Sequence, residues 1–198
     1  MGGVFRIIAW SMFRAEPGAV WDRVTDPAEL AHALPAWVRW DISDPHGLRT
    51  ALQHGSDRVF ATRLRALGRR IEMPVRVIDA SRHLRWTIRA DQGWFSPFEH
   101  RVRLERAIGG RVRLVHEVIA GPRVPGAWLV ARGVEAAMRR VQLRLAEVLP
   151  PDPATLARTR VYRLADGDAG HATDALHLDL GPEGSDDAQR PGDSAGAG

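Results

Sequence analysis

Several residue types are missing or scarce in this sequence, and each absence rules out a class of site. Cysteine is absent from all 198 residues, which excludes a disulfide framework, a thiol nucleophile and a thiolate metal site. Tyrosine occurs once, at Tyr162, so no phenol from residues 1–150 can act as an acid or an oxyanion donor. No apolar run approaches the length of a membrane span. Arg6 interrupts the apolar opening and no small-residue cleavage pattern follows it, so we expect no signal peptide and a cytoplasmic protein.

Lysine is also absent, so all 28 basic residues are arginines. One interpretation is a surface that binds phosphate or other anions, because the guanidinium group is a fork-shaped donor. The other is a coding bias toward arginine, alanine, glycine and proline. The arginines are scattered along the chain rather than clustered, so we favour the coding bias.

Charge divides the chain into two parts. Residues 1–150 carry 24 arginines against 15 acidic residues, whereas residues 151–198 carry 4 arginines against 9 acidic residues. The second part is rich in glycine, aspartate and proline and poor in large apolar residues, so it cannot bury enough surface to offset chain entropy. We therefore expect one domain at 1–150 and an acidic tail at 151–198 that is mostly disordered, from about residue 166 onward.

The order of hydrophobic periodicities predicts the architecture of the first part. A strand over 4–14 precedes two short helices over 17–25 and 27–34. Alternating strands then run from about 37 to 120, and an amphipathic helix closes the domain over 126–148. No helical pattern separates these strands, so we expect them to pair as an antiparallel meander.

Local signals refine these elements. Pro17 marks the first turn of the first helix. Asp26 and Glu29 form an aspartate version of a capping box at the start of the second helix. Pro74 removes a ladder donor, so we expect a bulge or an edge position there. Residues 44–57 are typical of a loop, with a short strand near 49–53 as an alternative.

Alternation with a period of two assigns the predicted strands an apolar face and an arginine-rich face. A half-buried antiparallel sheet with one solvated face has this pattern. The apolar positions of the later strands are Leu84, Trp86 and Ile88, then Phe98, His100, Val102 and Leu104, then Val112, Leu114, His116 and Val118.

Several segments resemble a known family. The segment EPGAVWDRVTDPAELAHALPAW resembles the two-helix opening of the START-like (SRPBCC) superfamily, which includes polyketide cyclases/dehydrases and the major birch pollen allergen. The segments RVIDASRHLRW, GWFSPFEHRVRLE and GGRVRLVHEVIAGPRVPG are similar to the strand-turn-strand segments that precede the last helix of that family. The resemblance covers residues 4–149.

The resemblance implies an α+β helix-grip fold for the domain at 1–150. In this fold a seven-stranded, curved antiparallel sheet with two short helices curls around a long C-terminal helix, over a hydrophobic cavity. Some relatives cyclise or dehydrate polyketide chains, while many only bind and carry lipids, polyketides or quinone-like molecules. We accordingly expect a small hydrophobic ligand and no cofactor.

Face assignment and the resemblance together give a candidate lining for this cavity. Trp94 stands apart from the others because it lies in a loop between two strands, where we expect the cavity mouth. The ligand-binding candidates are Trp40, Phe60, Met73, Val75, Trp86, Trp94, Phe98, Leu114, Val134 and Met138.

His100 and His116 are the polar residues on otherwise apolar strand faces, and they are the candidate catalytic residues. An imidazole that titrates near neutral pH can act as general acid or base on an enolisable carbonyl, which is the step that a cyclase requires. The alternative is a core histidine whose nitrogens are satisfied by neighbouring groups. Glu99 and Glu117 lie next to these histidines in sequence but point to the opposite face. Asp79 is a weaker acid/base candidate or a turn residue.

Other site classes lack a signal in the sequence. The eight histidines show no HExxH pattern and no close pair on a predicted helix, so we expect no metal site. No glycine-rich phosphate loop joins a strand to a helix, and no serine-containing nucleophile elbow is present.

Three functions remain. The leading one is a carrier or sensor for a small hydrophobic molecule, and the second is a cyclase/dehydrase that uses His100 or His116 as general base. The third is binding of nucleic acid or another anionic partner by the arginine-rich face; we rank this last, and oligomeric state is left open. The arginines concerned are Arg85, Arg89, Arg101, Arg103, Arg111 and Arg113.

Overall fold

The computed structural model describes residues 3–36, 38–66, 68–90, 95–123 and 127–164. They form a helix-grip α+β fold, as predicted. The elements follow one another as β1 (Val4–Phe13), α1 (Pro17–Val24), α2 (Pro27–Ala33), β2 (Val38–Ile42), α3 (Pro45–His54), β3 (Val59–Phe60), β4 (Thr62–Ala66), β5 (Arg69–Glu72), β6 (Val75–Ser81), β7 (Arg85–Ala90), β8 (Phe95–Ala107), β9 (Arg111–Pro122), α4 (Ala127–Ala146) and β10 (Arg158–Leu164).

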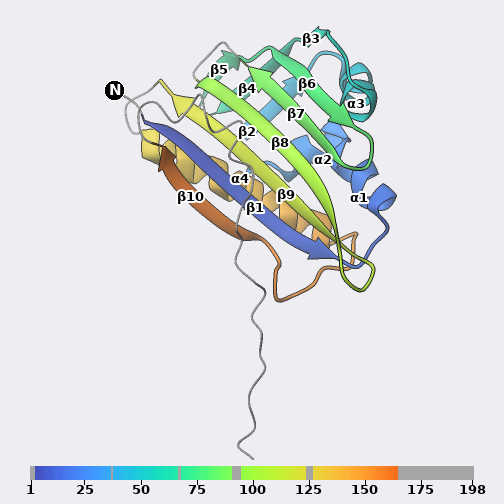
Figure 1. The fold of residues 1–198 in the computed structure, drawn as a ribbon. Coiled ribbons are helices and arrows are strands. Elements are labelled where there is room, and N and C mark those ends of the chain that lie inside the picture. Colours follow the sequence, from blue (N-terminus) through green and yellow to red (C-terminus); the bar gives the residue numbers. More distant parts are fainter. Residues whose placement is uncertain (1–2, 37, 67, 91–94, 124–126, 165–198) are drawn as a thin grey trace, which may run out of the picture. The chain divides into compact units, whose positions relative to one another are not determined.

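A seven-stranded antiparallel sheet forms one layer of the domain (Figure 1). Its strand order is β10-β1-β9-β8-β7-β6-β3, and β2, β4 and β5 form a separate three-stranded sheet. The longest pair, β8 with β9, turns at Gly109 and Gly110, which both have positive φ angles of 76° and 68°. Glycine adopts this backbone region without steric cost, and it suits a tight hairpin.

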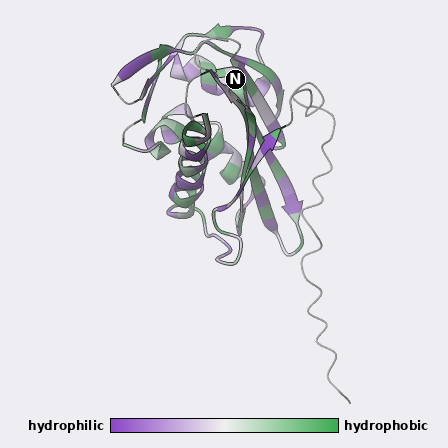
Figure 2. Ribbon diagram, turned by 90° about the vertical axis from the view of Figure 1, so that its left-hand side faces the viewer, coloured by the Kyte–Doolittle hydropathy of each residue, from purple (hydrophilic) through white to green (hydrophobic). Residues whose placement is uncertain are grey.

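α4 packs against the inner face of the large sheet, where it contacts β1, β9 and β10 (Figure 2). The buried apolar side chains of this helix are Ala131, Ala137, Met138, Val141 and Leu145. These join the inner-face residues of the strands in one continuous core. None of the helices in the described part of the chain, α4 included, is long and apolar enough to cross a bilayer.

The two short helices begin where the sequence predicts. Pro17 is in the first turn of α1, and the side chain of Asp26 accepts a hydrogen bond of 2.9 Å from the Ala28 N–H. The second half of the expected capping box is wrong, because Glu29 accepts a hydrogen bond from Arg23 at 2.5 Å instead. The helix start therefore depends on Asp26 alone.

The segment 44–57 contains a helix rather than the predicted loop. α3 begins after Asp44, whose side chain accepts a hydrogen bond of 2.8 Å from the Gly47 N–H. Leu48, Ala51 and Leu52 recur at helical spacing and are buried. The Asp44-Pro45 start repeats the Asp26-Pro27 start of α2, so the sequence does carry a signal for this helix.

The alternating segments 58–67 and 70–80 are each divided between the two sheets. Pro74 lies between two strands rather than at the bulge or edge position expected for it, because β5 stops at Glu72 in the small sheet and β6 starts at Val75 in the large sheet. Ala61 separates β3 and β4 in the same way. The Met73 N–H donates to the Thr62 carbonyl at 2.9 Å, which holds the two crossing points together.

The domain boundary predicted at residue 150 comes too early. β10 lies beyond it and pairs along its whole length with β1, from Val4 opposite Leu164 to Trp10 opposite Arg158. The arginines of β10 hid its alternation from the composition argument, although Val161 packs against the core. One compact unit accordingly spans Met1–Asp166, and residues 165–198, the rest of the predicted tail, lie outside the described residues.

This role of β10 predicts that its two faces differ in sensitivity to substitution. Val161→Asp should lower the free energy of unfolding by about 2–3 kcal/mol, because it places a charge against the core. Tyr162→Asp, one residue further on the exposed face, should change it by less than about 0.5 kcal/mol. Urea unfolding of both variants measures the difference. Equal, small effects would mean that β10 does not belong to the folded domain.

Candidate functional site

His100 and His116 meet inside the domain, as a pair on the inner face of adjacent strands. The β8–β9 register places them diagonally, with His100 opposite Val118 and His116 opposite Val102. His100 Nε2 lies 3.1 Å from His116 Nδ1, and the rings stack with centroids 5.3 Å apart. His100 also meets the edge of Trp86 at a centroid distance of 4.9 Å.

The short contact between the two rings couples their tautomers. Only one hydrogen can lie between His100 Nε2 and His116 Nδ1, so one ring donates and the other accepts. If His100 donates, His116 carries its own proton on Nε2, and if His116 donates, its Nε2 is an acceptor. His116 is fully buried, and its Nε2 has no partner among the described residues. The pair therefore offers a donor or an acceptor at this atom, whichever an incoming group requires.

Burial keeps both imidazoles neutral at physiological pH. It lowers the pKa of His100 from 6.5 to about 4. It lowers the pKa of His116 well below the usual value, and repulsion from His100 adds to this effect. A buried imidazolium would lose its hydration without gaining a carboxylate partner. The pair is thus a neutral hydrogen-bonding unit.

Most of the predicted lining residues belong to the same hydrophobic core. Phe60, Met73, Val75, Trp86, Leu114 and Met138 are buried in the core. Trp40, Phe98 and Val134 are partly buried and pack against it. Trp94 lies outside the described residues, so its expected place at a cavity mouth stays a prediction.

Gln142 is a buried polar residue of this interior that was not among the site residues predicted from the sequence. It lies on α4 and is fully buried, with no hydrogen-bond partner for either amide atom in the described structure. A polar residue four positions after Met138 and three before Leu145 lies on the sheet-facing side of a helix. This spacing could have identified Gln142 as an inward-facing residue from the sequence.

Two pockets of the described structure lie away from the histidines. One of about 360 Å³ is lined by Ala19, Asp22, Arg23, Asp26, Arg49 and Leu149. The other, of about 320 Å³, is lined by Glu16, Pro17, Gly18, His83, Leu84, Leu104, Arg106 and Val112. Neither includes His100, His116 or Gln142.

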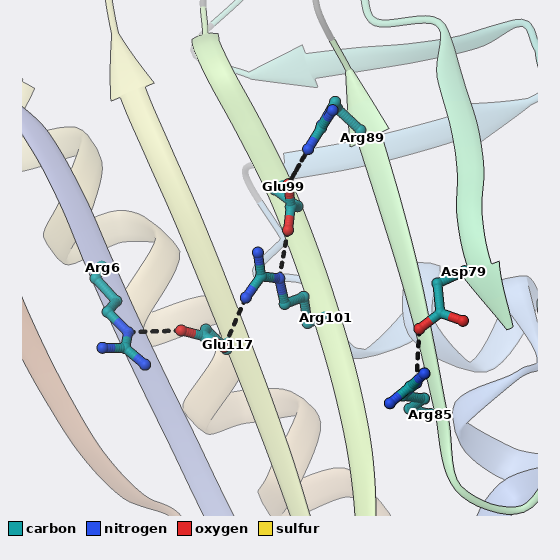
Figure 3. Close-up of polar contacts among 7 residues, drawn as sticks. All are labelled: Arg6, Asp79, Arg85, Arg89, Glu99, Arg101 and Glu117. Carbon is teal, nitrogen blue, oxygen red and sulfur yellow. Dashed lines mark hydrogen bonds and ion pairs between the residues drawn. The ribbon is translucent and has the colours of Figure 1, made fainter. Parts of the chain in front are cut away.

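The outer face of the sheet carries a chain of alternating charges across four strands (Figure 3). Arg89 donates to Glu99 at 2.8 Å, and Glu99 also accepts from Arg101. Arg101 lies 3.8 Å from Glu117, which accepts from Arg6 at 2.5 Å. Glu99 and Glu117 therefore face away from the histidines, as predicted. Glu117 is 1% exposed, so its two arginines are required to compensate its lost hydration.

These ion pairs weaken the case for an arginine-rich face that attracts polyanions. Five of the six arginines named for that function have an acidic partner. Besides Arg89 and Arg101, they are Arg85 with Asp79 at 2.6 Å, Arg111 with Asp152 at 3.0 Å and Arg113 with Glu105 at 3.8 Å. Asp79 accordingly serves as an ion-pair partner. The face is largely neutralised and does not present a row of free cations.

No group of three or more histidine, aspartate and glutamate side chains within the described ranges is arranged to hold a metal ion.

Comparison with known proteins identifies the family. A family model described as polyketide cyclase / dehydrase and lipid transport matches residues 11–150. No curated protein sequence gives a significant match to the chain.

Solved structures share the fold at low sequence identity. A protein from Chromobacterium violaceum is similar with a TM-score of 0.53 and 15% identity, over 74% of this chain and 98% of the other. A START superfamily protein from Mycobacterium smegmatis has a TM-score of 0.52 and 13% identity, over 73% and 99%. A protein from Thermus thermophilus has a TM-score of 0.50 and 15% identity, over 72% and 98%.

The lowered histidine pKa values predict a pH dependence of stability. Between the unfolded value of 6.5 and the folded value of about 4 for His100, the unfolded chain binds protons that the native state excludes. The free energy of unfolding should therefore be highest above pH 6.5 and fall on acidification, by up to about 1.4 kcal/mol per pH unit for each histidine. Urea unfolding at a series of pH values measures this slope.

Variants identify the source of the slope. His100→Gln and His116→Gln should each flatten it, whatever their effect on stability at neutral pH. His54→Gln, on the exposed end of α3, is the matched control and should leave it unchanged. A double variant with the wild-type slope would contradict the assignment.

The outer charge chain predicts a strong effect at its most buried member. Glu117→Gln should lower the free energy of unfolding by about 3–5 kcal/mol, because it leaves two arginines without their shared carboxylate. Glu105→Gln, whose side chain is 43% exposed, should cost less than about 1 kcal/mol. Chemical unfolding compares the two, and equal costs would show that burial of Glu117 does not matter.

Proposed function

Because the chain belongs to the polyketide cyclase/dehydrase and lipid transport family, we propose that it binds a small hydrophobic molecule between the seven-stranded sheet and α4. It acts as a carrier or sensor in the cytoplasm, and its ligand is lipid-like, polyketide-like or quinone-like. The inner-face residues named above form the apolar part of the site.

A set of buried polar atoms that have no hydrogen-bond partner among the described residues carries this proposal. They are His116 Nε2, both amide atoms of Gln142 and Trp86 Nε1. An unpaired buried polar group costs free energy that a hydrogen bond would recover. A ligand that brings an oxygen atom into this interior supplies that hydrogen bond.

The electrostatics of the interior select an uncharged ligand. Among the described residues, the buried charged side chains Glu99, Arg101 and Glu117 all lie on the outer face. His100 and His116 are neutral, so the described part of the interior offers no countercharge for a carboxylate or an ammonium group. The expected ligand is therefore an apolar molecule with a carbonyl or hydroxyl group.

We expect binding to displace side chains that line the sheet or α4, because neither of the two pockets described above includes the histidines. Small residues along α4, including Ala131, Gly133 and Ala137, limit the volume that has to move.

The contact between His100 and His116 favours a second candidate function, a cyclase/dehydrase. A neutral imidazole can remove a proton from carbon next to a carbonyl. A pKa of about 4 makes His100 a weak base at neutral pH, however, and the only tyrosine is on the outer face of β10, opposite Arg6. Binding without chemistry is thus the better-supported function.

Binding of matched probes tests the proposal. Native mass spectrometry and calorimetry would compare a decyl-substituted quinone with decylbenzene. The quinone should bind more tightly by about tenfold, which corresponds to roughly one hydrogen bond. His116→Leu and Gln142→Leu should reduce this preference while retaining decylbenzene binding, and His54→Leu should retain the preference.

The outcomes separate the two functions. Absence of binding by either probe, and of any copurified molecule, would refute the proposed site. Turnover of a linear poly-β-ketone that is lost in both His100→Ala and His116→Ala would establish the cyclase instead.

A further inference from the structure

The outward face of α4 combines large apolar side chains with arginines. Trp128 is 62% exposed, Leu129 is 59% exposed and Leu143 is 42% exposed. Arg132, Arg139 and Arg140 are exposed as well. In Figure 2, α4 lies against one side of the sheet, and among the described elements its main contacts are with β1, β9, β10 and α2.

Helix geometry places these six residues in one stripe. At about 100° per residue, the positions 128, 129, 132, 139, 140 and 143 fall within an arc of about 120°. The centre of this arc is near Ala136, on the opposite side of the helix from Met138, Val141 and Leu145, which face the sheet. α4 thus carries apolar side chains on two sides. One side packs in the core, and the other combines apolar side chains with arginines.

Charge along the stripe is unbalanced. Arg132 is paired with Glu135 at 2.6 Å. Arg139 and Arg140 have no acidic partner among the residues that the structure describes. The stripe therefore carries an excess of positive charge beside exposed tryptophan and leucine.

We propose that this stripe, defined by Trp128, Leu129, Arg132, Arg139, Arg140 and Leu143, docks the protein on a lipid bilayer that contains anionic lipids. Tryptophan and leucine insert at the boundary between headgroups and acyl chains, and arginines attract anionic headgroups. A nucleic acid would use the arginines but not Leu129 or Leu143. A second copy of the stripe would oppose like charges.

The docking surface is independent of the site between the sheet and α4. Its residues point away from His100, His116 and Gln142, so loss of docking would leave ligand binding intact. Failure of one proposal therefore does not imply failure of the other.

Vesicle co-sedimentation of the full chain tests this inference. Wild-type protein should bind phosphatidylcholine vesicles that contain about one third phosphatidylserine, bind phosphatidylcholine alone at least about tenfold more weakly, and detach as salt is raised. The paired variants Trp128→Ala/Leu129→Ala and Arg139→Gln/Arg140→Gln should each reduce binding to the mixed vesicles by about tenfold or more.

Matched controls lie at the far end of the β-hairpins. Ile108→Ala removes an apolar side chain that is 89% exposed, and Arg82→Gln removes an exposed arginine; both should leave vesicle binding unchanged. Absence of binding to mixed vesicles would overturn the inference, and so would wild-type binding by both paired variants. Dependence on the arginines alone would replace the bilayer with a soluble polyanion and equally overturn it. Circular dichroism spectra of all variants would confirm that they are folded.

Discussion

The pairing register between β8 and β9 determines which of their side chains face the core and which face outward. It pairs Phe98 with Ala120 and continues without a break to Ala107 opposite Arg111. Successive residues of a strand point to opposite faces, so this single register places His100 and His116 inside and Glu99, Arg101 and Glu117 outside. A shift by one residue would bury the charge chain under α4 and expose the histidines.

The two faces of the sheet accommodate buried polar groups in different ways. Outside, the carboxylates of Glu99 and Glu117 are buried against guanidinium groups of opposite charge. Inside, the histidines have no partner of opposite charge among the described residues and remain neutral, since desolvation penalises the charged form. The inner polar groups are consequently suited to recognise a neutral oxygen atom, and they are poor at strong base catalysis.

α4 serves both the core and the surface. Its inner side closes the sheet with alanine, methionine, valine and leucine, and Gln142 interrupts that apolar surface with an amide. Its outer side exposes Trp128 and Leu129 in the first turn, and the exposed arginines at positions 132, 139 and 140 follow along the same stripe. A helix that needed only solvation would carry polar residues there, so the apolar ones point to a function.

Periodicity and turn residues in the sequence predicted the antiparallel strands closed by a helix, the helices α1, α2 and α4, and the faces of His100, Glu99 and Glu117. The helix-grip fold itself was implied by the resemblance to the START-like superfamily. The predictions from periodicity depend on the spacing of residues along the chain, which can be read from the sequence alone. α3 was also predictable from its Asp-Pro start, whereas β10 was concealed by its arginines. Only the tertiary structure decided that His100 Nε2 meets His116 Nδ1, that Arg6 reaches Glu117 across 111 positions, and that Pro74 separates two sheets. Those outcomes depend on which strands become neighbours, because pairing energy is gained between residues that are distant in sequence.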